Sequence, residues 1–320
     1  MKRLLGLMLV MGMAGCGGND DAPPSGLLLT MTALPTPTDE AAAGTETVSA
    51  EGKGQTANAI PLPDAASVKQ PLTPAQLAVG DPIENSVGMV LVPIPAGEFL
   101  MGSPETEPKR LVGEVQHQVT LTKPFLLGVH EVTQGQWQAV MGTTPWKGRK
   151  RVKEGDDYPA TYVNWDDVVE FCRKLSEKEG LEYRLPTAAQ WEYACRAGTT
   201  TAYSFGDNDS ELGEYAWYTE NTRDAGQKYA HTVGRKKPNR WGLYDMHGNV
   251  WEWCSDWYGA YPSGDATDPT GPNSGSRRVL RGGSWSSLAG FWRSSLRYGR
   301  RPSSRGNRVG FRVTCVPSGQ

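Results

Sequence analysis

The twelve residues GLYDMHGNVWEW, from Gly242 to Trp253, decide the fold of this chain. Two carboxylates, Asp245 and Glu252, lie seven residues apart, and Gly248 between them allows a tight bend. Such a bend can turn main-chain carbonyls inward, and calcium takes about six to eight oxygen ligands, including carbonyls. The EF-hand spacing is absent. The residues alone leave two interpretations open: a calcium-binding loop, or a turn in which Glu252 pairs with an arginine.

The first sixteen residues, MKRLLGLMLVMGMAGC, have the features of a secretory signal. A basic start precedes a short apolar run that is too short to span a membrane. The ending resembles a bacterial lipobox, which predicts lipidation of Cys16, and several acyl chains on one residue anchor a protein stably. We therefore expect a lipid-anchored protein of the bacterial cell envelope. Gly17 after Cys16 favours the outer membrane, and the leaflet stays open.

Composition divides the rest of the chain into a tether and a domain. Residues 17–85 contain no Phe, Trp or Tyr and carry nine acidic residues against two lysines. Such a segment cannot bury enough apolar surface to fold, so we predict a disordered tether at 17–86 with a reach of roughly 45 Å. All eleven tryptophans follow it. We predict one domain at 87–316 and a tail at 317–320. The net charge of −2 gives no reason to expect nucleic-acid binding.

Within the domain, local signals predict strands first and short helices next. Residues 88–103 and 117–133 each suggest two strands, the second pair broken at Pro124. Three helices have capping residues at their start and glycines at their end. The starts are Thr133, Asn164 and Thr187, and the ends are Gly142, Gly180 and Gly198. After Gly198 we expect long loops with little regular structure.

Several ordered motifs resemble the formylglycine-generating enzyme, or sulfatase-modifying factor, family. Besides GLYDMHGNVWEW they are MVLVPIPAGEFLMGS, HEVTQGQW, PATYVNWDDVVEFC, YRLPTAAQWEYACRAG, RVLRGGSW and NRVGFR. The resemblance implies an α+β fold related to C-type lectins, with sparse regular secondary structure, long loops and bound calcium. The family's calcium ligands fall here on Asp245, Gly248, Val250 and Glu252, the middle two through carbonyls, and the ion would be structural. Asn221 matches a remnant of a second family site, for which no ion is predicted.

The predicted export and the family resemblance both bear on how the cysteines of the domain pair. In an oxidising compartment, Cys172, Cys195, Cys254 and Cys315 allow three disulfide pairings. Their spacing does not suggest zinc. The resemblance implies Cys172–Cys315, and we predict Cys195–Cys254 as the remaining pair.

The resemblance also locates an active site. Oxidase members of the family carry two cysteines after a Gly-Gly-Ser-aromatic turn, and these thiolates bind copper(I) and oxidise a substrate cysteine to formylglycine. The two positions fall here on Ser287 and Trp292. A serine hydroxyl is a poor copper(I) ligand and an indole is none. Copper is therefore not expected, and no catalytic residue is predicted.

The function expected from these observations is binding. The loop and the arginines after it predict a groove for a peptide or protein, lined by Ser284, Trp285, Ser287, Trp292, Arg293 and Arg297. The arginines also allow a purely structural interpretation, in which they pair with carboxylates and stack on tryptophans. Two alternatives stay open. One is an enzyme that matures sulfatases or runs a diverged reaction in the same pocket, and the other is a lectin-like sugar binder. The oligomeric state stays unknown.

Overall fold

Five strands form the first sheet of the domain. The computed structural model describes residues 81–288 and 290–316, so the predicted signal peptide with Cys16, most of the tether and the tail lie outside the described residues. The strand order is β1-β2-β5-β12-β6, with antiparallel pairing throughout. The bounds are β1 (Ile83–Glu84), β2 (Val90–Ile94), β5 (Phe125–Gly128), β12 (Thr314–Val316) and β6 (Glu182–Arg184). The end of the domain therefore closes the sheet between two strands from its first half.

The folded part begins earlier than predicted. Ile83 is buried and pairs with Leu91 of β2. The boundary at residue 87 is therefore wrong, because an edge strand without aromatic residues still adds to the sheet.

Two further sheets complete the β structure. A four-stranded sheet has the order β10-β9-β7-β11, and a three-stranded sheet has the order β3-β4-β8. Their strands are β7 (Trp251–Trp257), β9 (Arg278–Arg281), β10 (Tyr298–Arg300), β11 (Val309–Gly310), β3 (Gly97–Met101), β4 (His117–Leu121) and β8 (Ala266–Thr267). The strands predicted on either side of Pro95 and Pro124 are present, but the members of each pair belong to different sheets.

The predicted helix ends agree closely with the structure. The longer helices are α2 (Gln134–Met141), α3 (Trp165–Glu179) and α4 (Ala188–Arg196), each with a capping box at its first turn. Gly142 and Gly180 end α2 and α3 in the left-handed conformation, while α4 ends at Ala197, one residue before the predicted Gly198. A short 3-10 turn (Asp209–Glu211) leads into α5 (Leu212–Tyr215), and residues 216–250 contain no helix or strand. The expectation of long loops after Gly198 is thus confirmed, although β7, β9 and β10 form a sheet that was not predicted.

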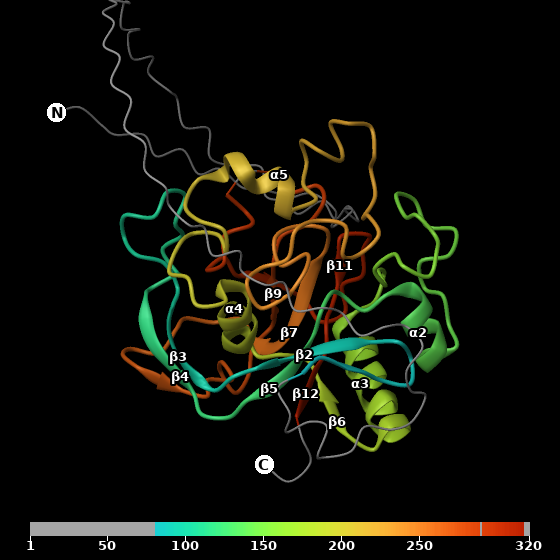
Figure 1. Ribbon diagram of the computed structural model, residues 1–320, viewed down its shortest axis with the longest axis horizontal. Coiled ribbons are helices and arrows are strands. Elements are labelled where there is room, and N and C mark those ends of the chain that lie inside the picture. Colours follow the sequence, from blue (N-terminus) through green and yellow to red (C-terminus); the bar gives the residue numbers. More distant parts are fainter. Residues whose placement is uncertain (1–80, 289, 317–320) are drawn as a thin grey trace, which may run out of the picture. The chain divides into compact units, whose positions relative to one another are not determined.

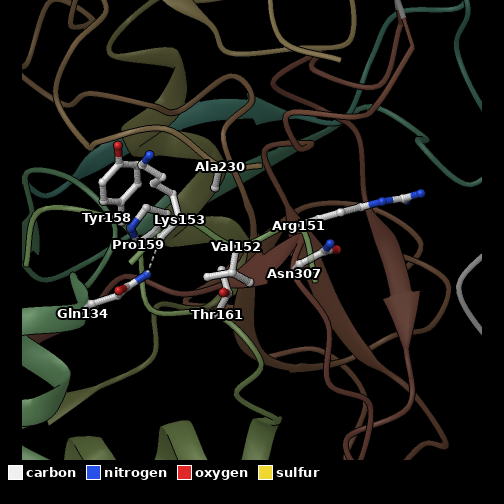
Figure 2. Close-up of a pocket in the computed structure, with 9 residues that line it drawn as sticks. All are labelled: Gln134, Arg151, Val152, Lys153, Tyr158, Pro159, Thr161, Ala230 and Asn307. Atoms are coloured by element: carbon white, nitrogen blue, oxygen red, sulfur yellow. Dashed lines mark hydrogen bonds between the residues drawn. The ribbon is translucent and has the colours of Figure 1, made fainter. Parts of the chain in front are cut away.

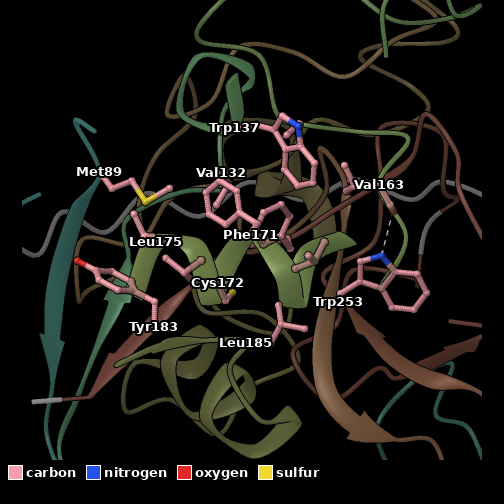
Figure 3. Packing of buried hydrophobic residues seen from close by; sticks show 14 of the residues in the cluster. Met89, Val132, Trp137, Val163, Phe171, Cys172, Leu175, Tyr183, Leu185 and Trp253 are labelled. Atoms are coloured by element: carbon pink, nitrogen blue, oxygen red, sulfur yellow. Dashed lines mark hydrogen bonds between the residues drawn. The ribbon is translucent and has the colours of Figure 1, made fainter. Parts of the chain in front are cut away.

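The helices pack on different sheets. Figure 1 shows α2 and α3 side by side, with α3 next to β6, and α4 between β3 and β7. The core around α3 is aromatic: Trp137 stacks on Phe171 at 5.4 Å between ring centroids, and Phe311 meets Phe171 edge-on at 5.2 Å. Figure 3 shows this cluster together with Trp253, whose indole nitrogen donates to the Val163 carbonyl at 3.4 Å. None of the described helices is long and apolar enough to cross a membrane.

Candidate functional site

The turn before β7 is held in a conformation that its sequence explains. Asp245, Gly248 and Asn249 all have positive φ, at 57°, 103° and 54°. A Cβ at Gly248 would lie 2.3 Å from the carbonyl oxygen of Trp217, so only glycine fits there. The Gly248 amide donates to the Gly282 carbonyl at 2.7 Å. This bond fixes the turn against the Gly-Gly-Ser-Trp loop, and the two motifs form one region.

Glu252 follows this turn and is fully engaged by donors. Its carboxylate receives two hydrogen bonds from Arg312, Nε to Oε2 at 2.7 Å and Nη2 to Oε1 at 2.8 Å. The indole nitrogen of Trp191 donates to the same Oε2 at 2.7 Å. All three side chains are fully buried. The pairing of Glu252 with an arginine, one of the two interpretations of the sequence, is therefore present.

Asp245 differs, because one of its oxygens is free. Oδ2 accepts from the Gly234 amide at 2.7 Å, while the buried Oδ1 has no hydrogen-bond partner. The same is true of both oxygens of Glu131, a fully buried residue that sequence reasoning did not select. The sequence does contain a signal for Glu131. In the motif HEVTQGQW, which follows Val129, it is the one carboxylate and lies next to Val132. Free, buried carboxylate oxygens are suitable ligands for a calcium ion, so the donor set of this region fits the expected metal.

Burial and the charges of neighbouring groups shift the pKa values of these two carboxyl groups. Burial raises the pKa of Glu131 well above its ordinary value, Asp245 and Glu252 raise it further, and Arg312 opposes them. Burial likewise raises the pKa of Asp245 to about 6, against the lowering effect of the Gly234 hydrogen bond and of Arg312.

The two positions that match the oxidase cysteines are structural in this chain. The Ser287 hydroxyl accepts a hydrogen bond from the Ser284 amide at 3.1 Å, and the Ser287 carbonyl accepts one from the Thr219 hydroxyl at 2.7 Å. Trp292 is fully buried in a cluster with Ala202, Tyr203, Leu212 and Ala216. A Cβ at Gly283, where φ is +81°, would lie 2.4 Å from the indole, so this glycine makes room for Trp292.

His247 supports the same loop from the opposite side. Nδ1 donates to the Trp292 carbonyl at 2.6 Å, and Nε2 accepts from the Ser204 amide at 3.1 Å. Burial lowers the pKa of His247 to about 4, so the ring is neutral at pH 7. These contacts give His247 a packing role.

The groove predicted from the sequence is not formed by the residues named for it. Ser284, Trp285 and Trp292 are buried, and Arg293 and Arg297 are 2% and 8% exposed. Arg293 binds Glu107 and Glu114, while Arg297 donates to the Gly113 carbonyl at 3.0 Å and lies over the Tyr261 ring. The structural interpretation of these two arginines is therefore correct. Among its described residues, the loop exposes the side chains of Leu288 and Phe291, at 65% and 44%.

The predicted disulfides are also absent from the structure. Cys172, Cys195, Cys254 and Cys315 are free, buried thiols. The sulfur of Cys195 faces the Ser294 hydroxyl at 3.5 Å and His247 Nε2 at 3.8 Å, so its neighbours are polar groups of other segments. All four thiols pack in the core of this structure, and neither predicted pairing is present.

Two cavities accompany these features. A cavity with a volume of about 10 Å³ is lined in part by Gln134, Tyr158 and Asn307, which Figure 2 draws as sticks. This volume is about the least that one water molecule needs. At its edge the Gln134 amide donates to the Lys153 carbonyl at 2.9 Å. A second cavity of about 300 Å³ lies between the β5 region and the start of α4, near Phe125 and Thr187. Neither is lined by Ser287 or Trp292.

Comparison with known proteins gives consistent matches. The family described as the sulfatase-modifying factor enzyme 1-like domain matches residues 75–316. The chain is 28% identical to the formylglycine-generating enzyme of Bos taurus over 284 residues, 70% of this chain and 74% of that enzyme. It is 33% identical to the chaperone protein LppX of Paenibacillus barcinonensis over 219 residues, 52% of this chain and 71% of that protein. Among solved structures, Treponema denticola variable protein 1 has a TM-score of 0.65 and 34% identity, covering 72% of this chain and 96% of its own.

Proposed function

Because the chain belongs to the sulfatase-modifying factor enzyme 1-like family, we propose that its domain is a protein-binding module without the copper-dependent oxidase activity of formylglycine-generating enzymes. The module binds apolar segments of a partner through exposed side chains of the loop that carries the active site in the oxidases. The partner is a protein or peptide, and the domain acts as an accessory to it.

The observation that carries this proposal is the burial of Trp292. Its indole occupies the interior at one position where the oxidases need a thiolate, and Ser287 at the other is bonded to its own loop. No cysteine lies in residues 280–297. A pair of soft donors for copper(I) therefore cannot assemble from this loop.

The exposed surface beside Trp292 supports binding. Leu288 and Phe291 project from the loop, and Leu111 and Val112, at 49% and 91% exposed, project from the segment next to it. The two segments touch, since Arg293 Nη2 donates to the Lys109 carbonyl at 2.9 Å. We call these four side chains the apolar surface. Exposed apolar side chains on neighbouring segments are a common feature of protein interaction sites.

The name of one relative supports a binding role. LppX of Paenibacillus barcinonensis is a chaperone by name, and a chaperone acts on other proteins. Under the proposal, lipidation of Cys16 would anchor the chain to the cell envelope, and the tether that precedes Ile83 would let the domain reach partners at a distance from the membrane.

Selection from a random peptide library on the immobilised full chain tests the proposal. We expect enrichment of peptides with large apolar residues, and Leu288→Asp and Phe291→Asp should each weaken binding of a selected peptide by about tenfold or more. Leu100→Asp is the control, because Leu100 has a similar exposure of 39% but lies on β3. A selected peptide that binds both loop variants as tightly as the unchanged chain would refute the assignment.

A further inference from the structure

Two segments that are far apart in the sequence are rich in lysine and arginine. The first, KGRKRVK at 147–153, follows α2 and carries five cations, and the second, RRPSSRGNR at 300–308, carries four arginines. Neither segment contains an aspartate or a glutamate. Nine positive charges therefore lie in two short segments of a chain whose net charge is −2.

Hydrogen bonds join the two segments in the fold. The Asn307 side-chain amide donates to the Lys150 carbonyl at 3.5 Å. Tyr162 contacts both segments, because its amide donates to the Gly306 carbonyl at 2.9 Å and its hydroxyl to the Lys150 carbonyl at 3.5 Å. Arg300 belongs to the same region, since a Cβ at Gly306 would lie 3.5 Å from its Nη2. The cations of both segments thus lie on one part of the protein.

The cations of the first segment are exposed and lack carboxylate partners. Within the described residues, none of them forms an ion pair, and these cations are Lys147, Arg149, Lys150, Arg151 and Lys153. In the second segment Arg305 pairs with Asp167. Burial of an opposite charge therefore does not explain why the first segment is so basic.

Acidic residues near the two segments offset only part of this charge. Glu154, Asp156 and Asp157 follow the first segment, and the Glu154 carboxylate accepts from the Gly148 amide at 3.1 Å. Counting these three residues and Asp167 against the nine cations leaves an excess of five positive charges. Such an excess attracts a negatively charged partner.

The shape of this region excludes a small anion held in a pocket. The cavity lined by Gln134, Arg151 and Asn307 has a volume of about 10 Å³, which is too small for a phosphate group. Arg151 has a positive φ of 59°, and Figure 2 shows its side chain extended away from Gln134 and Tyr158. The cations therefore face a partner that carries many negative charges over a broad surface.

We propose that these cations bind the headgroups of an anionic lipid membrane. We call them the basic surface, and its members are Lys147, Arg149, Lys150, Arg151, Lys153, Arg300, Arg301 and Arg308. A membrane with anionic lipids presents phosphates across a plane, and clustered Lys and Arg side chains bind to it. A guanidinium also donates two hydrogen bonds to one phosphate.

The predicted anchor makes a membrane the favoured partner over a soluble polyanion. Lipidation of Cys16 would keep a membrane within the reach of the tether, roughly 45 Å. The basic surface shares no residue with the apolar surface, so membrane binding and peptide binding are separate properties. Bound headgroups would hold the domain at the membrane, while the tether allows it to leave.

Co-sedimentation with lipid vesicles tests the proposal. A chain that begins at residue 17 keeps every described residue and lacks the apolar N-terminal run, so binding reports on the domain. We expect it to bind vesicles of phosphatidylglycerol and phosphatidylethanolamine in equal parts, and not vesicles of phosphatidylcholine. Binding should be lost at about 1 M salt, where the Debye length is about 3 Å.

The loop variant replaces three neighbouring cations by glutamine: Arg149→Gln, Lys150→Gln and Arg151→Gln in one chain. It should bind the anionic vesicles about tenfold more weakly or less, since each Lys or Arg near such a surface adds to the affinity. If this variant does not fold, Lys147→Gln with Lys153→Gln in one chain removes exposed cations of the same segment and should also weaken binding.

The matched control removes the same number of charges from exposed positions elsewhere: Lys123→Gln, Arg173→Gln and Lys237→Gln in one chain. It should bind the anionic vesicles like the unchanged chain. Equal losses in the control and the loop variant would overturn the proposal, because net charge alone would then explain binding.

Two other results would also overturn the proposal. One is equal binding of the unchanged chain to anionic and to phosphatidylcholine vesicles, or binding to neither. The other is binding to heparin without binding to the anionic vesicles, because the partner would then be a soluble polyanion. Peptide binding through the apolar surface is measured separately, so neither result bears on the proposed function.

Discussion

Arg293 and Glu114, 179 positions apart in the chain, form a two-pronged buried ion pair. Nη1 of the arginine lies 2.6 Å from Oε2 of the glutamate and Nη2 lies 2.8 Å from Oε1. Glu107 adds a further contact to Nη1 at 2.5 Å. The pair joins the segment that exposes Leu111 and Val112 to the loop that exposes Leu288 and Phe291. The apolar surface thus rests on a fixed electrostatic connection.

Arg293→Ala should destabilise the fold by about 3–5 kcal/mol, because it leaves two buried carboxylates without their partner. The measurement is urea unfolding followed by tryptophan fluorescence. Arg173→Ala is the control, since Arg173 pairs with Glu170 and Glu177 on the exposed side of α3. Exposed pairs of this kind contribute little to stability, so Arg173→Ala should change the unfolding free energy far less than Arg293→Ala. Equal effects of the two substitutions would contradict the role given to Arg293.

Substitutions of the neighbouring residues Phe291 and Trp292 should have different effects, one on peptide binding and the other on stability. Trp292→Ala removes a fully buried indole and should cost about 3–5 kcal/mol of unfolding free energy. Phe291→Ala removes a ring that is 44% exposed and should change stability far less while it weakens peptide binding. Thermal unfolding and peptide titration of both variants test this. A Phe291→Ala variant that binds normally would contradict the assignment of the apolar surface.

Acid should weaken the ion pair between Arg293 and Glu114. Burial raises the pKa of Glu114, but the hydrogen bonds and charge of Arg293, with the Ser103 hydroxyl, outweigh it and hold the pKa below its ordinary value of 4.5. An acid whose pKa is lowered by folding stabilises the fold above its unfolded pKa, and this contribution is lost as the pH falls through the folded pKa. The unfolding free energy should therefore decrease below about pH 4.5.

Glu114→Gln should flatten this acid dependence, whereas Glu105→Gln, on an exposed residue of the same segment, should keep it. Urea unfolding between pH 3 and pH 7 is the measurement. An unchanged slope in Glu114→Gln would show that other groups cause the acid response.

The four cysteines of the domain should be inert in the folded protein. Burial is the main cause that raises the pKa of Cys172, Cys195 and Cys315 to about 12, and it also raises that of Cys254. A Cys16→Ala chain should show no thiol reaction with Ellman's reagent until denaturant is added, and then four reactive thiols. Peptide mapping that finds Cys172 linked to Cys315 without reduction would instead restore the pairing implied by the family.

Much of the local structure was predictable because it depends on neighbours in sequence. Thr133, Asn164 and Thr187 cap their helices through residues three positions on, so a single segment contains the whole signal. The turn around Gly248 was likewise predictable from its glycine, and the family resemblance gave the fold class.

The features that were missed depend on contacts between distant segments. Glu131 becomes a candidate ligand only because Val129 pairs with Tyr244, more than a hundred residues later. The predicted groove failed for the same reason: Arg293 and Arg297 find their partners in residues 107–114, and nothing in the sequence around the two arginines predicts these contacts. Exposure depends on the folded chain. The sequence led us to expect Trp292 in the binding surface, but Trp292 is buried and its neighbour Phe291 is exposed.

The most direct test of the central claim is an oxidation assay. The purified chain is incubated with copper(I), oxygen and a cysteine-containing sulfatase peptide, beside the bovine formylglycine-generating enzyme as a positive control. The arrangement of Ser287 and Trp292 predicts that mass spectrometry finds the peptide cysteine unconverted by this chain and converted by the control. Formylglycine produced by this chain would contradict the account.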